Sequence, residues 1–446
     1  MGDDDGGISR RRFVKASAAL AAAPLFAGGL PAALATQDRE VEPQGERAQE
    51  PRPEPIRIGL IGCGGRGTGA ALNALSADKG VTLTALADVF ADRLESCLAN
   101  LKEEGDEEQI QVGESHRFLG FDAYRKLLES GVDGVLLATP PAFRPEHLRA
   151  AVAAGKHVFC EKPMAVDAPG VRSVLESAAR AREKGISLVS GFCWRYSAAE
   201  RATIKKLHDG ALGAIRAVYT TYNTGPLGTH PRKPEWSDME WQLRNWQHFA
   251  WLSGDHIVEQ ACHSIDKMAW AMRGELPERA TAVGGRQARS GPESGHIYDH
   301  FGVTYEFPSG ARGFHMCRQI DNCAHDNSDY IMGEKGICDI NGWAPRHRIT
   351  GESPWLYEDE GEENDMYQQE HDELFASIRS GEPINVGEWM AHSTLMAIMG
   401  RMAAYTGQTI TWEQALASEE SLAPATLEWG DLPVPAIAIP GKTKLL

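Results

Sequence analysis

The sequence lacks the spacings by which cysteine and histidine usually mark a metal site. Its 446 residues include eight cysteines, but no two form a C-x-x-C pair, and no H-E-x-x-H is present. Cysteines scattered through apparent strands and helices are typical of small, buried apolar side chains. We therefore expect neither a disulfide framework nor a zinc site, with Cys317 and Cys323 the nearest pair if a single bridge forms.

Basic residues are also in short supply. Lysine and arginine number 45 against 62 aspartate and glutamate, which gives a formal net charge of −17. A surface of this sign repels nucleic acid and anionic lipid, and it favours neutral or cationic small molecules. The charge balance therefore argues against a nucleic-acid partner.

Long apolar runs are absent beyond the first 35 residues. Ser9–Lys15 reads SRRRFVK, a twin-arginine pattern, and the weakly apolar stretch 16–35 ends in a candidate cleavage site, Ala33-Leu34-Ala35. Prolines and glycines interrupt this stretch, so a membrane anchor is the less favoured interpretation. We predict a twin-arginine signal over 1–35, a disordered linker over 36–55 and a periplasmic or otherwise exported protein, without membrane contact once the signal is removed.

The remaining chain is long enough for two domains. Over 56–190, short apolar strands alternate with helical stretches, which predicts an α/β domain with a doubly wound parallel sheet of the Rossmann type. Over 191–412, alternating strands around one strong helix, Ile257–Met272, predict an α+β domain with an open, mostly antiparallel sheet for substrate binding and oligomerisation. Helices expected within 367–406 can brace the first domain, and 413–446 is a C-terminal tail.

The first strand ends at glycines that fit a dinucleotide-binding turn. Ile56–Ile61 is a short apolar run, and Gly62, Gly64 and Gly67 then match G-x-G-x-x-G before a helical stretch. In this motif the first glycine makes the turn, the second admits the pyrophosphate and the third packs helix against strand. The helix N-terminus adds unpaired N–H groups and a positive dipole end. We therefore predict a cofactor-binding loop over 62–67 that also includes Cys63, Gly65 and Arg66.

Asp88 stands at the end of the second strand, 26 residues after Gly62. A carboxylate near this position accepts a hydrogen bond from the ribose 2′-hydroxyl of NAD and repels the 2′-phosphate of NADP. Arg93 follows closely and leaves NADP as an alternative. We therefore expect NAD as the cofactor.

Four motifs in order make the chain recognisable. They are GCGGRG at 62–67, ATPP at 138–141 with His147 after it, CEKP at 160–163 and GDHIVEQACHSID at 254–266. With these motifs the chain resembles the Gfo/Idh/MocA family of dinucleotide-dependent oxidoreductases, and the match spans about 56–412. The resemblance implies a Rossmann domain, an NAD(P) cofactor and hydride transfer. It also implies further cofactor contacts, from Thr139, Pro140, His147, Glu161 and Lys162.

The same resemblance implies the catalytic groups. In that family the lysine of EKP contacts the nicotinamide ribose and the substrate, and a D-x-x-x-H pair on a helix supplies an acid residue and a general base. Lys162 and His263 match these positions, and Glu259 stands where the family has aspartate. Residues four apart share a helix face, and a neutral imidazole beside a carboxylate suits the base that takes a hydroxyl proton. Lys162 can stabilise the developing alkoxide.

Candidate substrate contacts surround this helix. We assign Trp194, Arg195, Tyr196 and His256 to this role. Tryptophans at 236, 241, 246 and 251 mark a loop and helix start whose rings can pack in the core or stack on a sugar, beside His230, Arg244 and His248. His256, Glu259 and His263 would share one face of a continuous helix, but no further ligand is evident, so we predict no catalytic metal.

Three functions fit these residues. The first is an oxidoreductase that moves hydride between a hydroxyl of a sugar, polyol or glycoside and a tightly bound cofactor, which an exported enzyme must carry and regenerate. The second is a glycoside hydrolase or lyase that oxidises a ring hydroxyl transiently. The third is a non-catalytic sugar-binding subunit, against which intact Lys162 and His263 count. An open antiparallel sheet commonly forms subunit contacts, so we expect a homodimer or homotetramer.

Overall fold

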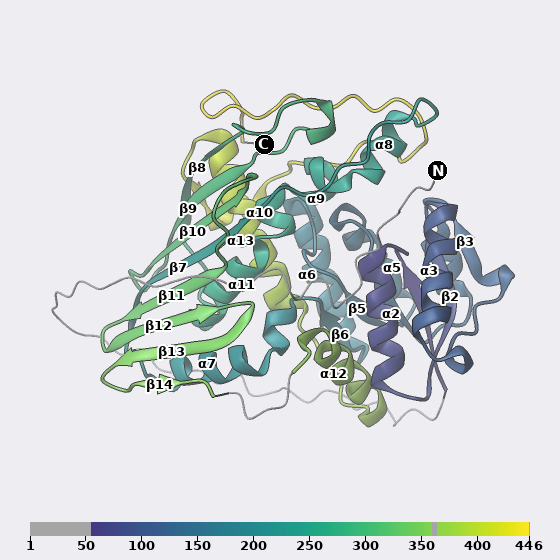
Figure 1. The fold of residues 1–446 in the computed structure, drawn as a ribbon, viewed down its shortest axis with the longest axis horizontal. Helices are drawn as coiled ribbons and strands as arrows, with labels where there is room; N and C mark the ends of the chain where they lie inside the picture. The colour runs from purple at the N-terminus through teal and green to yellow at the C-terminus, as the bar shows by residue number, and fades with distance from the viewer. Residues whose placement is uncertain (1–54, 359–363, 446) are drawn as a thin grey trace. The chain divides into compact units, whose positions relative to one another are not determined.

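A computed structural model describes residues 55–358 and 364–445. The predicted export signal and most of the predicted linker lie outside the described residues. Within them, the chain forms two sheets, one fully parallel and the other mostly antiparallel, as the sequence predicts (Figure 1). No helix in the described part is long and apolar enough to cross a membrane.

The first sheet has six parallel strands in the order β3-β2-β1-β4-β5-β6. Ile61 at the end of β1 aligns with Ala87 of β2 and Leu137 of β4, so the carboxyl ends of the strands meet at one edge. This is the edge at which parallel sheets bind ligands. The strands are β1 (Ile56–Ile61), β2 (Val81–Asp88), β3 (Arg117–Leu119), β4 (Gly134–Leu137), β5 (His157–Cys160) and β6 (Leu188–Ser190).

Helices cover both faces of this sheet. Ile56, Ile58 and Leu60 alternate along β1 and pack in a core cluster with side chains of α2, α3 and α12, whereas Ile61 packs in a second cluster with side chains of α4, α5 and α6. The period of two along a strand separates the faces in this way. The helices are α2 (Gly65–Ala77), α3 (Ala91–Glu104), α4 (Ala123–Glu129), α5 (Arg144–Ala153), α6 (Ala168–Glu183) and α12 (Met366–Ser380).

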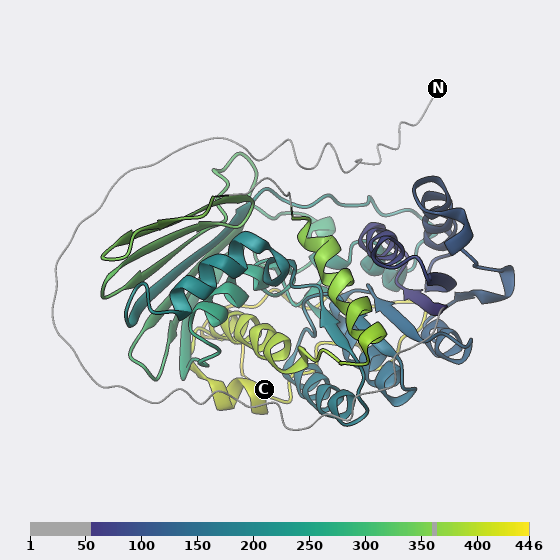
Figure 2. The same cartoon turned by 90° about the horizontal axis from the view of Figure 1, so that it is seen from below.

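The second sheet has nine strands in the order β14-β13-β12-β11-β7-β10-β9-β8-β15. Its pairs are antiparallel except for β7 with β10. Among the described residues, helices cover only one face of this sheet (Figure 2). The strands are β7 (Ile215–Thr224), β8 (Arg279–Gly285), β9 (His300–Glu306), β10 (Arg312–Gln319), β11 (Ser328–Gly333), β12 (Gly336–Asn341), β13 (Ala344–Gly351), β14 (Trp355–Leu356) and β15 (Ile410–Thr411).

The chain returns to the first domain through α12 and α13 (Gly387–Thr406), as the sequence predicts. Arg379 of α12 forms an ion pair with Asp78 at 2.6 Å, and Gln368 accepts a hydrogen bond from Asn73 at 2.8 Å. α13 packs along α6. The remaining α-helices are α7 (Ala198–His208), α8 (Asp238–Arg244), α9 (Ala250–Ser253), α10 (His256–Glu259), α11 (Cys262–Ala271) and α14 (Trp412–Ala417).

Two features differ from the sequence prediction. The sequence did not predict five of the strands, which are β3, β8, β13, β14 and β15. β3 has three residues and none of them is buried, so its sequence carries no apolar pattern. The predicted helix Ile257–Met272 is wrong as a single element, because α10 ends at Glu259 and α11 begins at Cys262.

Candidate active site

The glycine loop between β1 and α2 has the geometry that a pyrophosphate requires. Gly62 has φ +100°, and a Cβ on Gly67 would lie 1.9 Å from the carbonyl oxygen of Gly62. A Cβ on Gly64 or Gly65 would meet nothing within 4 Å, so the backbone there faces open space. α2 begins at Gly65 and directs its first N–H groups toward this space. The loop therefore fits an anionic dinucleotide.

Asp88 lies at the end of β2 beside this loop. Its carboxylate accepts hydrogen bonds from the backbone N–H of Cys63 at 2.7 Å and of Phe90 at 2.9 Å. Burial raises its pKa, and the hydrogen bonds oppose that shift. Asp88 thus joins the glycine loop to the start of α3 while it lines the adjacent cavity.

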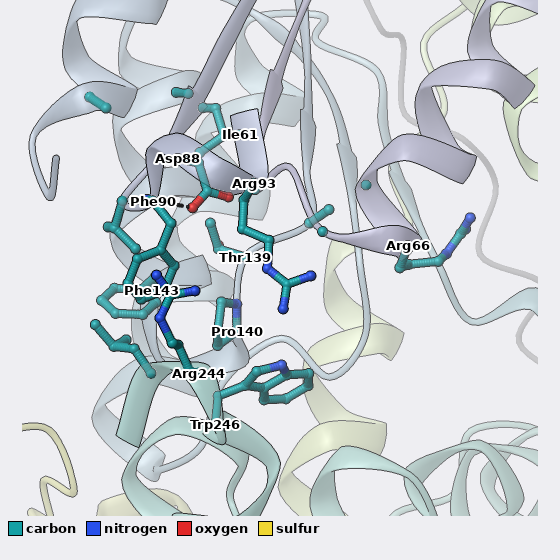
Figure 3. Close-up of a pocket in the computed structure, with 18 of the residues that line it drawn as sticks. Ile61, Arg66, Asp88, Phe90, Arg93, Thr139, Pro140, Phe143, Arg244 and Trp246 are labelled. Atoms are coloured by element: carbon teal, nitrogen blue, oxygen red, sulfur yellow. Dashed lines mark hydrogen bonds between the residues drawn. The ribbon is translucent and has the colours of Figure 1, made fainter. Parts of the chain in front are cut away.

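A cavity of about 320 Å³ adjoins the loop and Asp88 (Figure 3). Thr139 and Pro140 form part of its wall, and His147 lies behind Thr139, whose hydroxyl is 3.3 Å from the imidazole Nδ1. Burial, aided by the charge of Arg144, lowers the pKa of His147 to about 3, so its ring is neutral. The structure therefore brings most of the predicted cofactor residues to one cavity: Gly62, Gly64, Gly65, Arg66, Gly67, Asp88, Thr139, Pro140 and His147.

Two predicted cofactor residues direct their side chains elsewhere. The guanidinium of Arg66 points away from the cavity (Figure 3) and forms ion pairs with Glu161 and with Glu370 of α12. Glu161 is 3% exposed and also accepts a hydrogen bond from the N–H of Lys162 at 3.1 Å. These side chains connect the glycine loop to α12 and to the C-E-K-P turn. Contact of Arg66 and Glu161 with the cofactor therefore stays a prediction, which for Arg66 rests on its place in the cavity wall.

Lys162 follows β5 at the ligand-binding edge and reaches into the second domain. Its ammonium donates to the backbone carbonyl of Glu259 at 2.6 Å and lies 3.4 Å from the Glu259 carboxylate. Burial lowers the pKa of Lys162, but Glu259, Cys262 and Glu161 together raise it by more, so the net shift is upward. Lys162 is therefore a buried cation at the boundary of the two domains.

This contact lies at the break between α10 and α11. In a continuous helix the carbonyl of Glu259 would accept from the N–H of His263. Here Lys162 takes that carbonyl, and the N–H of His263 bonds to the carbonyl of Gln260 at 3.4 Å. No hydrogen bond joins Glu259 to His263 in the described structure, so the expectation of an imidazole held against this carboxylate on one helix face is corrected.

His263 begins the second half of the broken helix and is 8% exposed. Its ring centroid lies 5.2 Å from that of Trp194 and 6.0 Å from that of Phe192. Burial and then the positive charges of Lys162, Lys267 and Arg66 hold its pKa well below the usual value. The imidazole is therefore neutral and can accept a proton.

Three of the four predicted substrate contacts lie elsewhere in the structure. Arg195 pairs with Asp266 through two hydrogen bonds of 2.8 Å. Tyr196 is 3% exposed within the core of the first domain. His256 is buried, and its Nδ1 lies 3.0 Å from Asp255. Of the four, Trp194 alone has a ring contact with His263, whereas the polar groups of Arg195 and His256 bond to buried carboxylates and Tyr196 lies in the core. Contact of these residues with a substrate stays a prediction.

The tryptophan-rich segment lies at the cofactor cavity and not at His263. Trp241 and Trp251 are buried in a small cluster of their own, whereas Trp246, together with Arg244 and His230, lines the cavity. Sequence reasoning missed this role. Its only signal was the clustering of aromatic and basic residues, which does not identify the surface they face.

The cysteines and acidic groups form no metal site in the part of the chain that the structure describes. All eight cysteines are free thiols, and seven of them are buried. Cys317 and Cys323 are therefore not bridged.

Comparisons with known proteins connect this geometry to a family. The chain is 30% identical over 179 residues to a 2,7-anhydro-N-acetylneuraminate hydratase of Escherichia coli K12, a match that covers 40% of this chain and 44% of that protein. It is 30% identical over 213 residues to a glycosyl hydrolase family 109 protein of Streptomyces coelicolor, a match that covers 47% of this chain and 43% of that protein. The matched region thus spans less than half the length of these curated relatives.

A solved structure shows the same fold. The aldose-aldose oxidoreductase of Caulobacter crescentus, solved in complex with glycerol, aligns with a TM-score of 0.64 at 23% identity, over 80% of this chain and 100% of that chain.

Two family models match consecutive parts of the chain. Residues 56–190 match the model described as an oxidoreductase family with an NAD-binding Rossmann fold. Residues 201–339 match the GFO/IDH/MocA C-terminal domain. The two matches cover more than half of the chain and include the glycine loop, Lys162 and His263. The chain therefore belongs to the Gfo/Idh/MocA family of oxidoreductases.

Proposed function

We propose that this protein is an NAD(P)-dependent oxidoreductase that transfers hydride between a hydroxyl-bearing carbon of a sugar, polyol or glycoside and a tightly bound nicotinamide cofactor. One observation carries the proposal. The ammonium of Lys162 bonds to Glu259 at the ligand-binding sheet edge, and the neutral His263 lies four residues further on, at the start of α11. A general base and a cation near one hydroxyl are the groups that alcohol oxidation needs.

The proposed roles follow from the charges. Bound NAD(P) supplies the nicotinamide that accepts or returns the hydride. His263 takes the hydroxyl proton, since its neutral ring persists at physiological pH. Lys162 stabilises negative charge that develops on the same oxygen. Glu259 holds the ammonium in place and balances its charge, and Trp194 provides an apolar wall beside the imidazole.

We also propose that the protein is exported through the twin-arginine route, on the basis of Ser9–Lys15 and the apolar stretch after it. An exported enzyme cannot draw on a free dinucleotide pool, which favours a resident cofactor regenerated by a second half-reaction. Cell fractionation tests this route. We expect the wild type to be recovered outside the cytoplasm in processed form, and a variant with both Arg10 and Arg11 replaced by lysine to stay uncleaved in the cytoplasm.

A homodimer or homotetramer through the second sheet is part of the proposal. The helix-free face of that sheet exposes Phe314, Met316, Tyr330 and Met332, each between 37% and 44%. Adjacent exposed apolar side chains of this kind are unusual on a monomer.

A second candidate is a glycoside hydrolase or lyase that oxidises a ring hydroxyl transiently and returns the hydride. The similarity to a protein named as a glycosyl hydrolase and to one named as a hydratase supports it. This chemistry has no net oxidant. It would release an aglycone from a p-nitrophenyl glycoside with no accumulation of NADH.

The experiment begins with the nucleotide in protein purified without added cofactor. The protein is denatured, and NAD, NADH, NADP and NADPH in the supernatant are quantified per chain. The native protein is then offered sugars, polyols and glycosides one at a time, and bound NADH is followed spectroscopically. We expect near-stoichiometric nucleotide and reduction by at least one carbohydrate in the wild type, but no reduction in His263→Ala. A protein that neither contains nor binds any nicotinamide dinucleotide would rule out both enzyme functions.

A further inference from the structure

The cofactor cavity has a wall that the Rossmann domain does not supply. This wall comes from residues 228–248, here called the strap, which belong to the second half of the chain. In Figure 3, Arg244 and Trp246 of the strap lie across the cavity from Asp88 and Thr139. A dinucleotide on the glycine loop would therefore be covered by the strap. The strap residues that line the cavity are Gly228, His230, Leu243, Arg244, Asn245, Trp246 and Gln247.

The strap is tied to the Rossmann domain beside the cavity. Arg244 forms an ion pair with Asp92 in the first turn of α3, with Nη1 2.9 Å from Oδ2 and Nη2 3.4 Å from Oδ1. Its guanidinium lies 4.0 Å from the ring centroid of Phe90, which lines the cavity. Glu240, one turn earlier on α8, holds the Nε of Arg244 at 2.9 Å. Arg244 thus joins the strap to the cavity rim by charge and by stacking.

The strap is also closed on itself. The Asn245 side chain accepts from the N–H of His230 at 2.7 Å and donates to its carbonyl at 3.1 Å. The imidazole of His248 lies 3.1 Å from the carbonyl oxygen of Gly228. These bonds join the two ends of the strap, so it behaves as one piece and not as a free loop.

The C-terminal tail holds the strap from outside. The Gln242 side chain donates to the carbonyl of Leu432 at 2.6 Å, and the N–H of Met239 donates to the carbonyl of Gly430 at 3.1 Å. Trp429 precedes Gly430 in the tail, and its ring centroid lies 4.9 Å from that of Phe121 and 5.8 Å from that of Phe90. Both phenylalanines line the cavity. The tail therefore contacts the strap and the rim at the same point.

We propose that the strap and the tail form a clamp that retains the nicotinamide dinucleotide between turnovers. Release then requires the Arg244–Asp92 pair to separate and the Trp429 ring to leave Phe90 and Phe121. The proposal takes from the proposed function only the identity of the ligand. It concerns the rate at which the nucleotide leaves and is independent of which carbohydrate is oxidised.

The test measures nucleotide release from the full-length protein with NADH as the probe. Protein loaded with NADH is mixed with a large excess of NAD, and the loss of bound NADH fluorescence gives the dissociation rate. The variants are Arg244→Met, which keeps the apolar stem but removes the charge, and Trp429→Ala. Arg348→Met is the matched control for the first, because Arg348 also pairs with an aspartate, Asp339, at 2.8 Å, but lies on β13 and outside the cavity lining.

Trp343→Ala is the control for the second substitution, since Trp343 is 40% exposed, close to the 48% of Trp429, and lies outside the cavity lining. We expect release to accelerate roughly 5- to 30-fold in Arg244→Met and in Trp429→Ala. The controls should stay within about twofold of the wild type. Trp429→Phe should restore slow release, because a smaller ring still packs against Phe121.

The outcomes separate the two proposals. Equal release rates in the wild type, Arg244→Met and Trp429→Ala overturn the clamp, and so does equal acceleration in the control variants. Slow release that depends on Arg244 and Trp429, in a protein that oxidises no carbohydrate, supports the clamp and refutes the proposed function. Thermal unfolding of each variant without nucleotide identifies any that lose structure. If Arg244→Met does so, the release rate of Arg244→Lys is measured in its place, and if Trp429→Ala does so, that of Trp429→Phe.

Discussion

Replacement of Lys162 by methionine separates the structural and the chemical role of this residue. Lys162 and Glu259 have side chains that are 14% and 10% exposed, so the pair is largely shielded from water. Methionine keeps the length of the side chain but leaves the Glu259 carboxylate buried without its cation. Loss of one partner of a buried pair costs about 3–5 kcal/mol. We expect Lys162→Met to lower the free energy of unfolding by that amount.

The double variant Lys162→Met with Glu259→Gln removes the buried charge as well. What remains is a backbone carbonyl and an amide that have lost one donor, which costs about 1–3 kcal/mol. The double variant should therefore be more stable than Lys162→Met alone. Its rate of hydride transfer should nevertheless stay about 10²- to 10³-fold below the wild type, as in the single variant, because the cation at the reacting oxygen is still missing.

The assays are urea unfolding followed by tryptophan fluorescence, and single-turnover formation of bound NADH with a carbohydrate that the wild type oxidises. Lys156→Met is the control, since the Lys156 ammonium donates to the carbonyl of Val132 at 2.8 Å. It loses a lysine-to-carbonyl bond and should cost only about 0.5–1.5 kcal/mol with no change in rate. Recovery of the rate in the double variant would refute a chemical role for Lys162. Equal loss of stability in Lys162→Met and Lys156→Met would refute the buried pair.

Three further outcomes follow from the structure. Because burial and nearby cations hold the pKa of His263 well below its usual value, its neutral form persists as the pH falls. The rate of hydride transfer should therefore stay constant as the pH is lowered through about 6.5, the usual pKa of histidine. A fall in rate centred at that pH would contradict the role of His263 as the base. Gly67→Ala would place a Cβ 1.9 Å from the carbonyl oxygen of Gly62 and should lower the midpoint of thermal unfolding. The Cβ of Gly64→Ala meets nothing within 4 Å, so this variant should keep the midpoint but bind NADH more weakly. Thermal unfolding of both variants with and without NADH measures these effects. Tyr330→Lys, at a position 37% exposed on the helix-free sheet face, should convert the proposed oligomer to monomer in light scattering, and an unchanged mass would place the interface elsewhere.

The first domain was predictable because its signals are local. The alternation along β1, the G-x-G-x-x-G spacing and the leucines of α3 each lie within about four turns or one strand of sequence, and the structure has the strand, the loop and the helix that they predict. The carboxyl edge of a parallel sheet then gathers Asp88 and Thr139 at the loop without further information. By contrast, β3 has three residues, none of them buried, and left no pattern to find.

The bonding partners of several predicted site residues lie far away in the sequence. Nothing near Arg195 in the sequence indicates that Asp266 takes its guanidinium, or that Trp270 and Trp389 enclose it at 4.6 Å and 4.2 Å. Arg66 is likewise drawn from the cavity by Glu370, which lies far along the chain. The sequence shows that these residues are arginines, but the orientation of each guanidinium depends on a carboxylate that only the folded chain brings near it.

The break between α10 and α11 is a further case, because the side chain that bonds to the backbone there, Lys162, lies 97 residues before Glu259. Helical periodicity across Ile257–Met272 is real, and both halves are helical. Between the two halves the N–H of Ala261 bonds to the carbonyl of His256 at 3.0 Å, and the Lys162 ammonium bonds to the carbonyl of Glu259 at 2.6 Å, so the regular helical bonds are interrupted there.

The contact between Lys162 and Glu259 joins the two domains at the proposed point of chemistry. Lys162 belongs to the carboxyl edge of the parallel sheet, and Glu259 and His263 belong to the second domain. The ammonium of Lys162 bonds to the carbonyl of Glu259, and the N–H of His263 bonds to the carbonyl of the next residue, Gln260, so the cation and the base are held by neighbouring backbone groups. Lys162→Met therefore removes both a charge and a contact with the segment that carries His263, and because the double variant lacks the same contact, its rate tests these two losses together.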